Sequence, residues 1–255
     1  MREFTEGLLS GTEPALADEV DLIDWDPDGE RKMLAAMMYP YSRLPETQLI
    51  EVVDRLTSEE RIDLVRRYVG DRANRRHRPG RALERLDYRF DILGDYGGFR
   101  DMQRHRLLTI EWQSLAPYHG YEIPEAVRSA GLADRYDGVM ERSSALYDLL
   151  LNDFPEQASY AVAMAYRVRY VMQFNAREAL HMIELRSQPQ GHPNYRRIAQ
   201  AMYQQIASKA SHSAVAEMFT YIDLTAGEDG RLQAEKALDA RRSAHTLDPV
   251  KKRQT

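Results

Sequence analysis

The chain has no cysteine among its 255 residues. Disulfide bonds, thiolate metal sites and cysteine nucleophiles are therefore excluded from its chemistry. Lysine is also scarce, because only five of the 35 basic residues are lysine and the other 30 are arginine. The rigid guanidinium fork of arginine binds phosphates, carboxylates and ring carbonyls, so this bias suits recognition of an anionic or electron-rich ligand.

Long apolar runs and a strong net charge are absent as well. No apolar stretch approaches the roughly 18 residues that a transmembrane helix needs, and the polar N-terminus does not have the pattern of a signal peptide. The net charge of −5 gives no electrostatic reason to expect general binding to nucleic acid or to membranes. We therefore expect a cytoplasmic protein, and a hydrophobic content of 43% suffices for one substantial core.

The order of predicted elements combines strands and helices. Before residue 130 the patterns predict a flexible lead-in over 1–17, a strand over 20–25, a helix starting at Asp26-Pro27, helices over 46–56 and 58–69, a strand over 86–92 and a short helix over 99–103. After residue 130 the pattern is helical, over 132–151, over 155–185, from Pro193 and over 212–222.

Two arginines flank a histidine at Arg104, His105 and Arg106. Apolar and polar residues then alternate over 107–113, which predicts a β-strand with one buried face. At the entrance to this strand the three side chains can converge on one ligand. The alternative interpretation is an arginine-rich surface turn, because charged clusters are usually solvated.

A second polar cluster lies on the predicted helix over 155–185 and directly after it. On one continuous helix Arg177 and His181 share a face, while Asn175 and Arg186 fall together on another. Buried arginine is unfavourable unless it is paired. The two glutamates of this segment, at positions 178 and 184, are available partners. A structural ion-pair network and a ligand site are therefore both open interpretations.

The densest positive run covers residues 72–81, and Pro79-Gly80 makes it a loop. Such a loop can clamp a pyrophosphate or the phosphate of a nucleotide. A solvated basic loop is the alternative interpretation. An RNA-binding module is a weaker one, because the aromatic residues expected for base stacking are not interleaved with the arginines.

The two clusters together resemble a known family. Arg-His-Arg followed, after seven residues, by Ser114 resembles the signature of the flavin-dependent thymidylate synthases, and the stretch from Asn175 to Arg186 is similar to their flavin- and nucleotide-binding helix. The resemblance covers residues 77–222. It implies a synthase that converts dUMP to dTMP, with NADPH reducing the flavin and methylenetetrahydrofolate supplying the one-carbon unit. It also implies a homotetramer whose sites are shared between subunits.

The resemblance assigns roles to individual residues and implies no metal site. FAD would be bound by Arg104, His105, Arg106, Asn175, Arg177 and His181. The catalytic dUMP half would include Ser114 and Arg186, with the guanidinium of Arg186 stabilising negative charge on the uracil. His77 and Glu84 stand near the place of the family's histidine-containing loop and the glutamate after it, with a longer spacing than in the family.

Four positions depart from the family pattern, all in the nucleotide half of the site. Asp101 stands where the family usually has Gln, Trp112 where it has Glu, and Ala116 and Ser159 where it has Arg. An aspartate near anionic dUMP would repel it. Two functions are therefore open: an active synthase with a divergent dUMP pocket, or a non-catalytic FAD-binding subunit or half that completes the site of a paralogous partner chain.

These observations predict an α+β fold in which a small antiparallel sheet is packed against a mostly helical C-terminal half. Three segments are expected: an N-terminal lead-in and helical accessory segment over 1–70, a flavin-dependent thymidylate synthase-like domain over 71–225, and a charged tail over 226–255. The sheet would carry the Arg-His-Arg junction.

Overall fold

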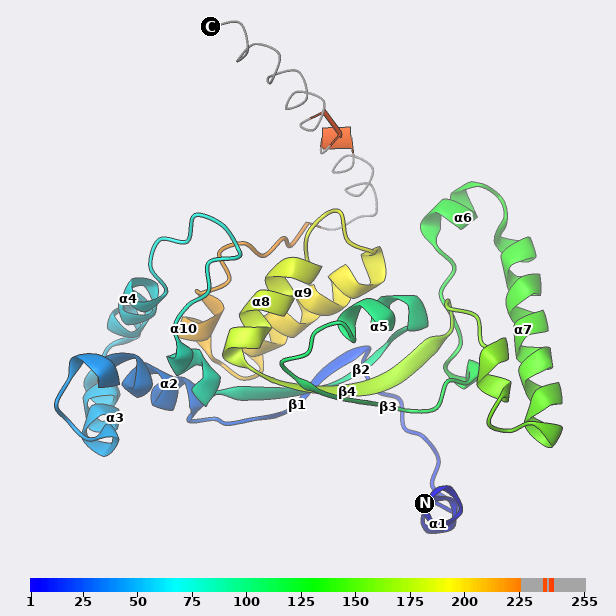
Figure 1. Cartoon of the computed structure of the whole chain (residues 1–255), viewed down its shortest axis with the longest axis horizontal. Helices are drawn as coiled ribbons and strands as arrows, with labels where there is room; N and C mark the ends of the chain where they lie inside the picture. Colours follow the sequence, from blue (N-terminus) through cyan, green and yellow to red (C-terminus); the bar gives the residue numbers. More distant parts are fainter. Residues whose placement is uncertain (226–235, 238, 241–255) are drawn as a thin grey trace, which may run out of the picture.

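One antiparallel sheet forms the centre of the protein (Figure 1). The computed structural model describes residues 1–225, 236–237 and 239–240. The sheet has four strands in the order β1-β2-β4-β3. They are β1 (Val20–Trp25), β2 (Asp87–Asp95), β3 (Thr109–Trp112) and β4 (Arg167–Asn175). The predicted α+β fold with a small antiparallel sheet is confirmed.

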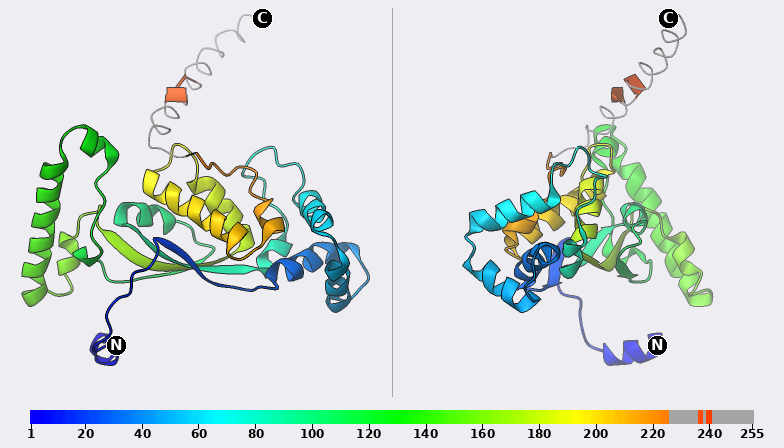
Figure 2. Two further views of the ribbon diagram at one scale, coloured as in Figure 1. Left: turned by 180° about the vertical axis from the view of Figure 1, so that it is seen from behind. Right: turned by 60° about the vertical axis from the view of Figure 1, so that its left-hand side comes forward.

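Helices surround this sheet in the described part of the chain. Those before β3 are α1 (Arg2–Leu8), α2 (Gly29–Met38), η1 (Tyr39–Tyr41), α3 (Glu46–Arg55), α4 (Ser58–Val69), η2 (Arg81–Arg85) and α5 (Tyr96–Met102). Those after β3 are η3 (Pro117–His119), α6 (Glu125–Ser129), α7 (Ala133–Asp153), η4 (Ala158–Ala161), α8 (Ala176–Arg186), α9 (Pro193–Ser208) and α10 (Ser213–Ala216). Helices α5, α8 and α9 lie over one face of the sheet, with α2–α4 at one end and α6–α7 at the other (Figure 2).

Strand β4 corrects the largest error of the sequence prediction, which placed one helix over residues 155–185. Residues 167–175 instead form an inner strand that pairs with β2 along all nine residues. The side chains at alternate positions are buried: Val168, Tyr170, Met172 and Phe174. A period of two with aromatic and β-branched residues suits a strand, and pairing with distant strands overrides the local helical spacing.

Several helix boundaries are confirmed and others are wrong. The helices predicted over 46–56, 58–69 and 132–151 and from Pro193 are present as α3, α4, α7 and α9. Helix α2 begins two residues later than predicted, at Gly29, because the side chain of Asp26 first accepts a backbone N–H in a turn. Helix α5 begins earlier than predicted, at Tyr96, because Asp95 accepts the backbone N–H of Gly98 and caps it. The predicted lead-in contains α1, and α10 is much shorter than the predicted helix over 212–222.

Strand β3 lies at an edge of the sheet and pairs only with β4. The predicted strand over 107–113 is present over four residues, but its predicted buried face is largely wrong. Ile110 is half-buried, while Trp112 is 50% exposed. An edge strand has a neighbour on one side only, and here that leaves most of its side chains uncovered.

The main core lies between the sheet and the helices over it. Leu22, Met33, Val53 and Val65 belong to the same buried cluster as the residues of β2, β4 and α8. Residues 20–69 therefore contribute to this core, whereas residues 4–18 are exposed, and the separation of residues 1–70 as an accessory segment stays a prediction. A second buried cluster lies under α7. Most of the predicted tail over 226–255 lies outside the described residues, and none of the described helices is long and apolar enough to span a membrane.

Candidate functional site

The end of β4 and the start of α8 hold the late polar cluster against the arginine-rich loop. Asn175 caps α8, since its side chain accepts the backbone N–H of Glu178 at 3.0 Å. Arg177 Nε donates to the carbonyl of Pro79 at 3.1 Å. These bonds fix the first turn of α8 beside the loop over residues 71–80.

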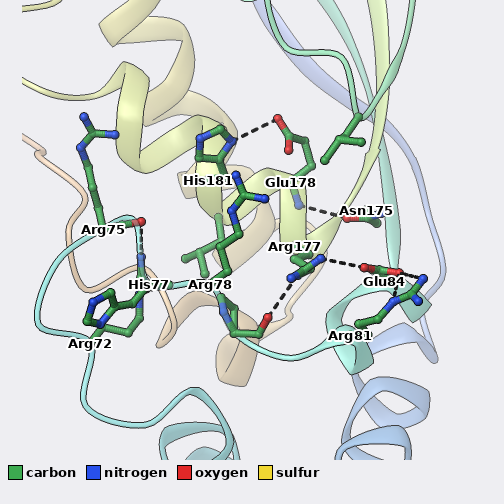
Figure 3. Close-up of a pocket in the computed structure, with 13 residues that line it drawn as sticks. Arg72, Arg75, His77, Arg78, Arg81, Glu84, Asn175, Arg177, Glu178 and His181 are labelled. Carbon is green, nitrogen blue, oxygen red and sulfur yellow. Dashed lines mark hydrogen bonds and ion pairs between the residues drawn. The ribbon is translucent and has the colours of Figure 1, made fainter.

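A cavity of about 630 Å³ lies between this loop and the first two turns of α8 (Figure 3). Most of its polar lining consists of cationic and imidazole side chains: Arg75, His77, Arg78, Arg81, Arg177 and His181. Leu107 and Leu180 contribute apolar surface. The volume lies in the range of small-molecule sites, and the guanidinium groups favour a ligand with phosphates.

Glu84 compensates two of these arginines. Its carboxylate lies 2.8 Å from Arg81 and 2.9 Å from Arg177. The Arg81 guanidinium, reinforced by that of Arg177, lowers the pKa of the Glu84 carboxyl below its usual range. Across residues 1–225, Arg75 and Arg78 have no carboxylate within ion-pair distance. Their charges are therefore available to a ligand.

A buried ion pair stabilises the loop over residues 71–80. Arg72 binds Glu184 in bidentate geometry, with N–O distances of 2.7 and 2.5 Å, and the two side chains are 3% and 0% exposed. Arg72 also donates to the backbone carbonyls of Arg75 and His77 at 3.1 Å each. Arg72 therefore shapes the loop, and its guanidinium is committed to Glu184 instead of to a ligand.

His105 reaches α8 from the loop after α5. Its Nδ1 lies 2.8 Å from a carboxylate oxygen of Glu178, and its Nε2 accepts a hydrogen bond from Arg186 Nε at 3.1 Å. Glu178 also lies 3.5 Å from Nδ1 of His181. Burial alone would raise the pKa of the Glu178 carboxyl, but its hydrogen bonds to the two histidines outweigh burial and lower it.

This lowered pKa gives a pH prediction. The pKa of Glu178 is lower in the folded protein than in the unfolded chain. The ionised carboxylate therefore stabilises the fold at every pH above the unfolded-state pKa, and this stabilisation is lost as the pH falls through the folded-state pKa. The advantage of the wild type over Glu178→Gln in free energy of unfolding should therefore shrink below about pH 4. Urea unfolding of both proteins across acidic pH measures it, and an advantage that grows on acidification would contradict the assignment.

The donor atoms of His105, Glu178 and His181 lie within 4.8 Å of one another, which matches the composition of a divalent-metal site. Two features oppose that use. Arg186 already occupies Nε2 of His105, and the arginines of the cavity repel a cation. The arrangement favours a hydrogen-bonded network beside an anion site.

The structure brings some predicted site residues together and leaves others apart. Asn175, Arg177 and His181 line the cavity. His105 is 7% exposed and contacts the same helix through Glu178. The facing of Arg177 and His181 is as predicted, while Asn175 caps the start of α8 and Arg186 ends it, so these two residues lie at opposite ends of the helix.

The flanking arginines and the serine lie elsewhere. Arg104 and Arg106 are exposed and do not line the cavity, and Arg104 lies 3.3 Å from the carboxylate of Asp101. Ser114 is exposed beyond the far end of β3, where Trp112 pairs with Tyr170. Within one chain, Ser114 therefore does not share a cavity with the α8 residues.

Sequence reasoning named both glutamates of α8 as possible ion-pair partners of arginine but not their actual contacts. Glu184 does bind an arginine, Arg72 of the loop, whereas Glu178 binds two histidines. The contact of Glu178 with His181 is local to α8, whereas the contacts of Glu184 with Arg72 and of Glu178 with His105 join residues 112 and 73 positions apart. The local sequence carries no signal for them.

Comparison with known proteins decides the family. Residues 21–211 match the family described as thymidylate synthase complementing protein, Thy1. The chain belongs to the flavin-dependent thymidylate synthase family. This match starts at residue 21, so β1 and α2–α4 lie within the region shared with the family, which the motifs between residues 77 and 222 did not indicate.

The relatives and solved structures agree with this membership. The chain is 38% identical over 236 residues to the UPF0159 protein of Chlamydia pneumoniae, covering 92% of this chain and 44% of the relative. The chain thus spans less than half the length of the curated relatives it matches. Its fold resembles the flavin-dependent thymidylate synthase ThyX of Helicobacter pylori complexed with FAD and dUMP, at a TM-score of 0.59 and 19% identity over 81% of this chain and 100% of that one.

A second solved structure has a different activity in its name. It is the UMP/dUMP methylase PolB of Streptomyces cacaoi bound with 5-Br dUMP, with a TM-score of 0.58 and 18% identity over 76% of this chain and 93% of that one. At these identities the two likenesses establish the flavin-dependent thymidylate synthase fold and leave the activity of this chain to be argued from its own residues.

The four departures from the family pattern have structural settings. The backbone carbonyl of Asp101 accepts from Arg186 Nη2 at 2.5 Å, and its carboxylate is close to Arg104. The ring of Trp112 lies 5.5 Å from that of Phe99. The other two, Ala116 and Ser159, lie in or beside the second buried cluster near α7. The Asp101 carboxylate is therefore partly compensated by an arginine.

Proposed function

We propose that the chain is an FAD-dependent thymidylate synthase, which converts dUMP to dTMP with methylenetetrahydrofolate and NADPH. The observation that carries this proposal is one cationic cavity lined both by the arginine-rich loop and by the family-motif residues of α8. A protein of the same fold is complexed with FAD and dUMP, which supports the choice of ligands. A cytoplasmic homotetramer belongs to the same proposal.

The residues present fit a flavin dinucleotide. Arg75 and Arg78 are guanidinium groups without a carboxylate partner among the described residues, as binding a pyrophosphate requires. Arg177, which is paired with Glu84, adds a third guanidinium, and Leu107 and Leu180 offer apolar surface for a ring system. The proposed set also includes Asn175 and His181 on the cavity wall, and Arg104, His105 and Arg106, which lie outside its lining. When bound, FAD would supply the redox chemistry, while the protein supplies binding, orientation and electrostatics.

The proposed dUMP half depends on Arg186. Hydrogen bonds to His105 Nε2 and to the Asp101 carbonyl hold its guanidinium, whose side chain is 13% exposed. A fixed cation against the uracil would stabilise negative charge that develops on the ring, and preorganisation of this kind is usually a large term in catalysis. Ser114 lies outside the α8 cavity, and in the proposed assembly it would join this half from a second copy.

A second candidate function is a non-catalytic FAD-binding subunit or half that completes the site of a paralogous partner. One observation favours it: the curated relatives are more than twice as long as their match to this chain. A second domain or chain would then supply the groups that Trp112, Ala116 and Ser159 replace. The FAD cavity would be retained while the dUMP half is shared.

Turnover separates the two functions. The purified chain is incubated with FAD, dUMP, methylenetetrahydrofolate and NADPH, and dTMP is measured by chromatography. Formation of dTMP by the chain alone supports the synthase. Bound FAD without dTMP, with activity restored by a partner chain, supports the subunit. A protein that takes up no FAD contradicts both.

A further inference from the structure

Glu178 is a buried carboxylate to which the family motifs assign no role. It is 5% exposed and lies between the imidazoles of His105 and His181. His105 in turn faces Arg186, so a hydrogen-bonded series runs from the start of α8, through the loop after α5, to the end of α8.

The proton positions along this series follow from the donors. Arginine has only N–H donors and remains charged in proteins, so Arg186 Nε must donate and His105 Nε2 must accept. A neutral imidazole with a free lone pair on Nε2 carries its proton on Nδ1. That proton points at the carboxylate of Glu178, 2.8 Å away. Glu178 therefore selects the tautomer in which His105 can accept from Arg186.

The other contacts of Arg186 involve atoms other than Nε, which donates to His105. Nη2 donates to the carbonyl of Asp101 at 2.5 Å, Nη1 lies 3.8 Å from the Asp101 carboxylate, and the guanidinium lies over the ring of Tyr195, 5.3 Å from its centroid. None of these three contacts holds Nε. Loss of the acceptor on His105 would free one edge of the guanidinium and let it rotate.

We infer that Glu178 is a positioning residue, which fixes the His105 tautomer and through it the orientation of the Arg186 guanidinium. The inference rests on the proposed function only where it assigns Arg186 to dUMP. The ring tautomer and the hydrogen bonds belong to the chain itself, so they can be tested without any ligand.

The first readout is the tautomer of His105 in the full chain, measured by ¹⁵N NMR of the histidine rings at about pH 8, where imidazoles are mostly neutral. The His105 signals are identified by their loss in His105→Gln. In the wild type we expect the proton on Nδ1. Glu178→Ala should shift population to the Nε2-protonated form, and Glu178→Gln, whose amide oxygen can still accept, should keep the wild-type tautomer.

The second readout is dUMP binding by calorimetry with the FAD-loaded chain. Glu178→Ala should weaken binding about 10-fold, as expected for one lost hydrogen bond to a charged group. Glu178→Gln should restore most of the dUMP affinity together with the wild-type tautomer of His105. If Glu178 acted through packing alone, Glu178→Ala would weaken dUMP binding without changing that tautomer. The matched control is Glu217→Gln, an exposed glutamate bound to Arg66 that should change neither readout.

The outcomes distinguish the inference from the proposed function. A wild-type His105 protonated on Nε2, or a tautomer unchanged in Glu178→Ala, overturns the inference whatever the ligand. The expected tautomers in a protein that binds no dUMP support the series of hydrogen bonds and count against the proposed function alone.

Discussion

Replacing Glu184 with alanine should lower the free energy of unfolding by about 3–5 kcal/mol. The side chain of Arg72 is 3% exposed, so the substitution leaves a buried guanidinium without its carboxylate partner. A buried charge that loses its partner keeps the full desolvation cost and no longer has the Coulombic attraction that offset it. The Glu184→Ala substitution also removes the carboxylate oxygen that accepts a hydrogen bond from the backbone N–H of Tyr221.

Urea denaturation of wild type and variant measures this change. The matched control is Glu217→Ala, because Glu217 pairs with Arg66 at 2.7 Å but both side chains are well exposed. Its loss should cost no more than about 1 kcal/mol. Equal losses for the two variants would contradict the buried pair. Because Arg72 also binds two carbonyls of the loop, Glu184→Ala should weaken FAD binding as well.

Replacing Arg177 with alanine should weaken FAD binding about 10- to 100-fold, the range expected for a lost hydrogen bond to a charged group. Arg177 lines the cavity and is the second residue of α8. Its removal also leaves Glu84 with one cation fewer. The remaining carboxylate would then repel a phosphate more strongly, so both effects act in the same direction.

Quenching of flavin fluorescence during titration measures this affinity. Arg67→Ala is the matched control, because Arg67 is 77% exposed on α4 and pairs only with Asp63 of its own helix within the described chain. It should leave FAD affinity unchanged. Glu84→Gln should not weaken FAD binding, since it releases Arg81 and Arg177 from their carboxylate. Loss of affinity in Glu84→Gln, or none in Arg177→Ala, would contradict the assignment.

The fold could be predicted where local patterns agree with tertiary contacts. The helix predicted over 58–69 is present as α4, whose start is fixed by the capping box of Thr57 and Glu60, and the strand predicted over 86–92 is present as β2. Residues 167–175 could not be placed in this way. Their apolar residues also fit a helical spacing, and only pairing with β2 and β3, from distant parts of the chain, selects the strand.

The site residues also fall into those that the sequence predicted and those that depend on contacts between distant segments. The resemblance identified Asn175, Arg177 and His181, and the structure places all three on one cavity. The partners that organise the cavity depend on contacts between distant segments, such as Arg72 with Glu184. The exposure of Ser114 could not be foreseen either, since the structure places this residue outside the cavity.

In the proposed function, the arginine-rich loop and the start of α8 together bind one FAD molecule. A crystal structure of the full chain with FAD would show this binding site. We expect the pyrophosphate beside Arg75, Arg78 or Arg177, in the cavity that Asn175 and His181 line. FAD bound away from this cavity in every copy, or crystals that take up no FAD, would contradict it.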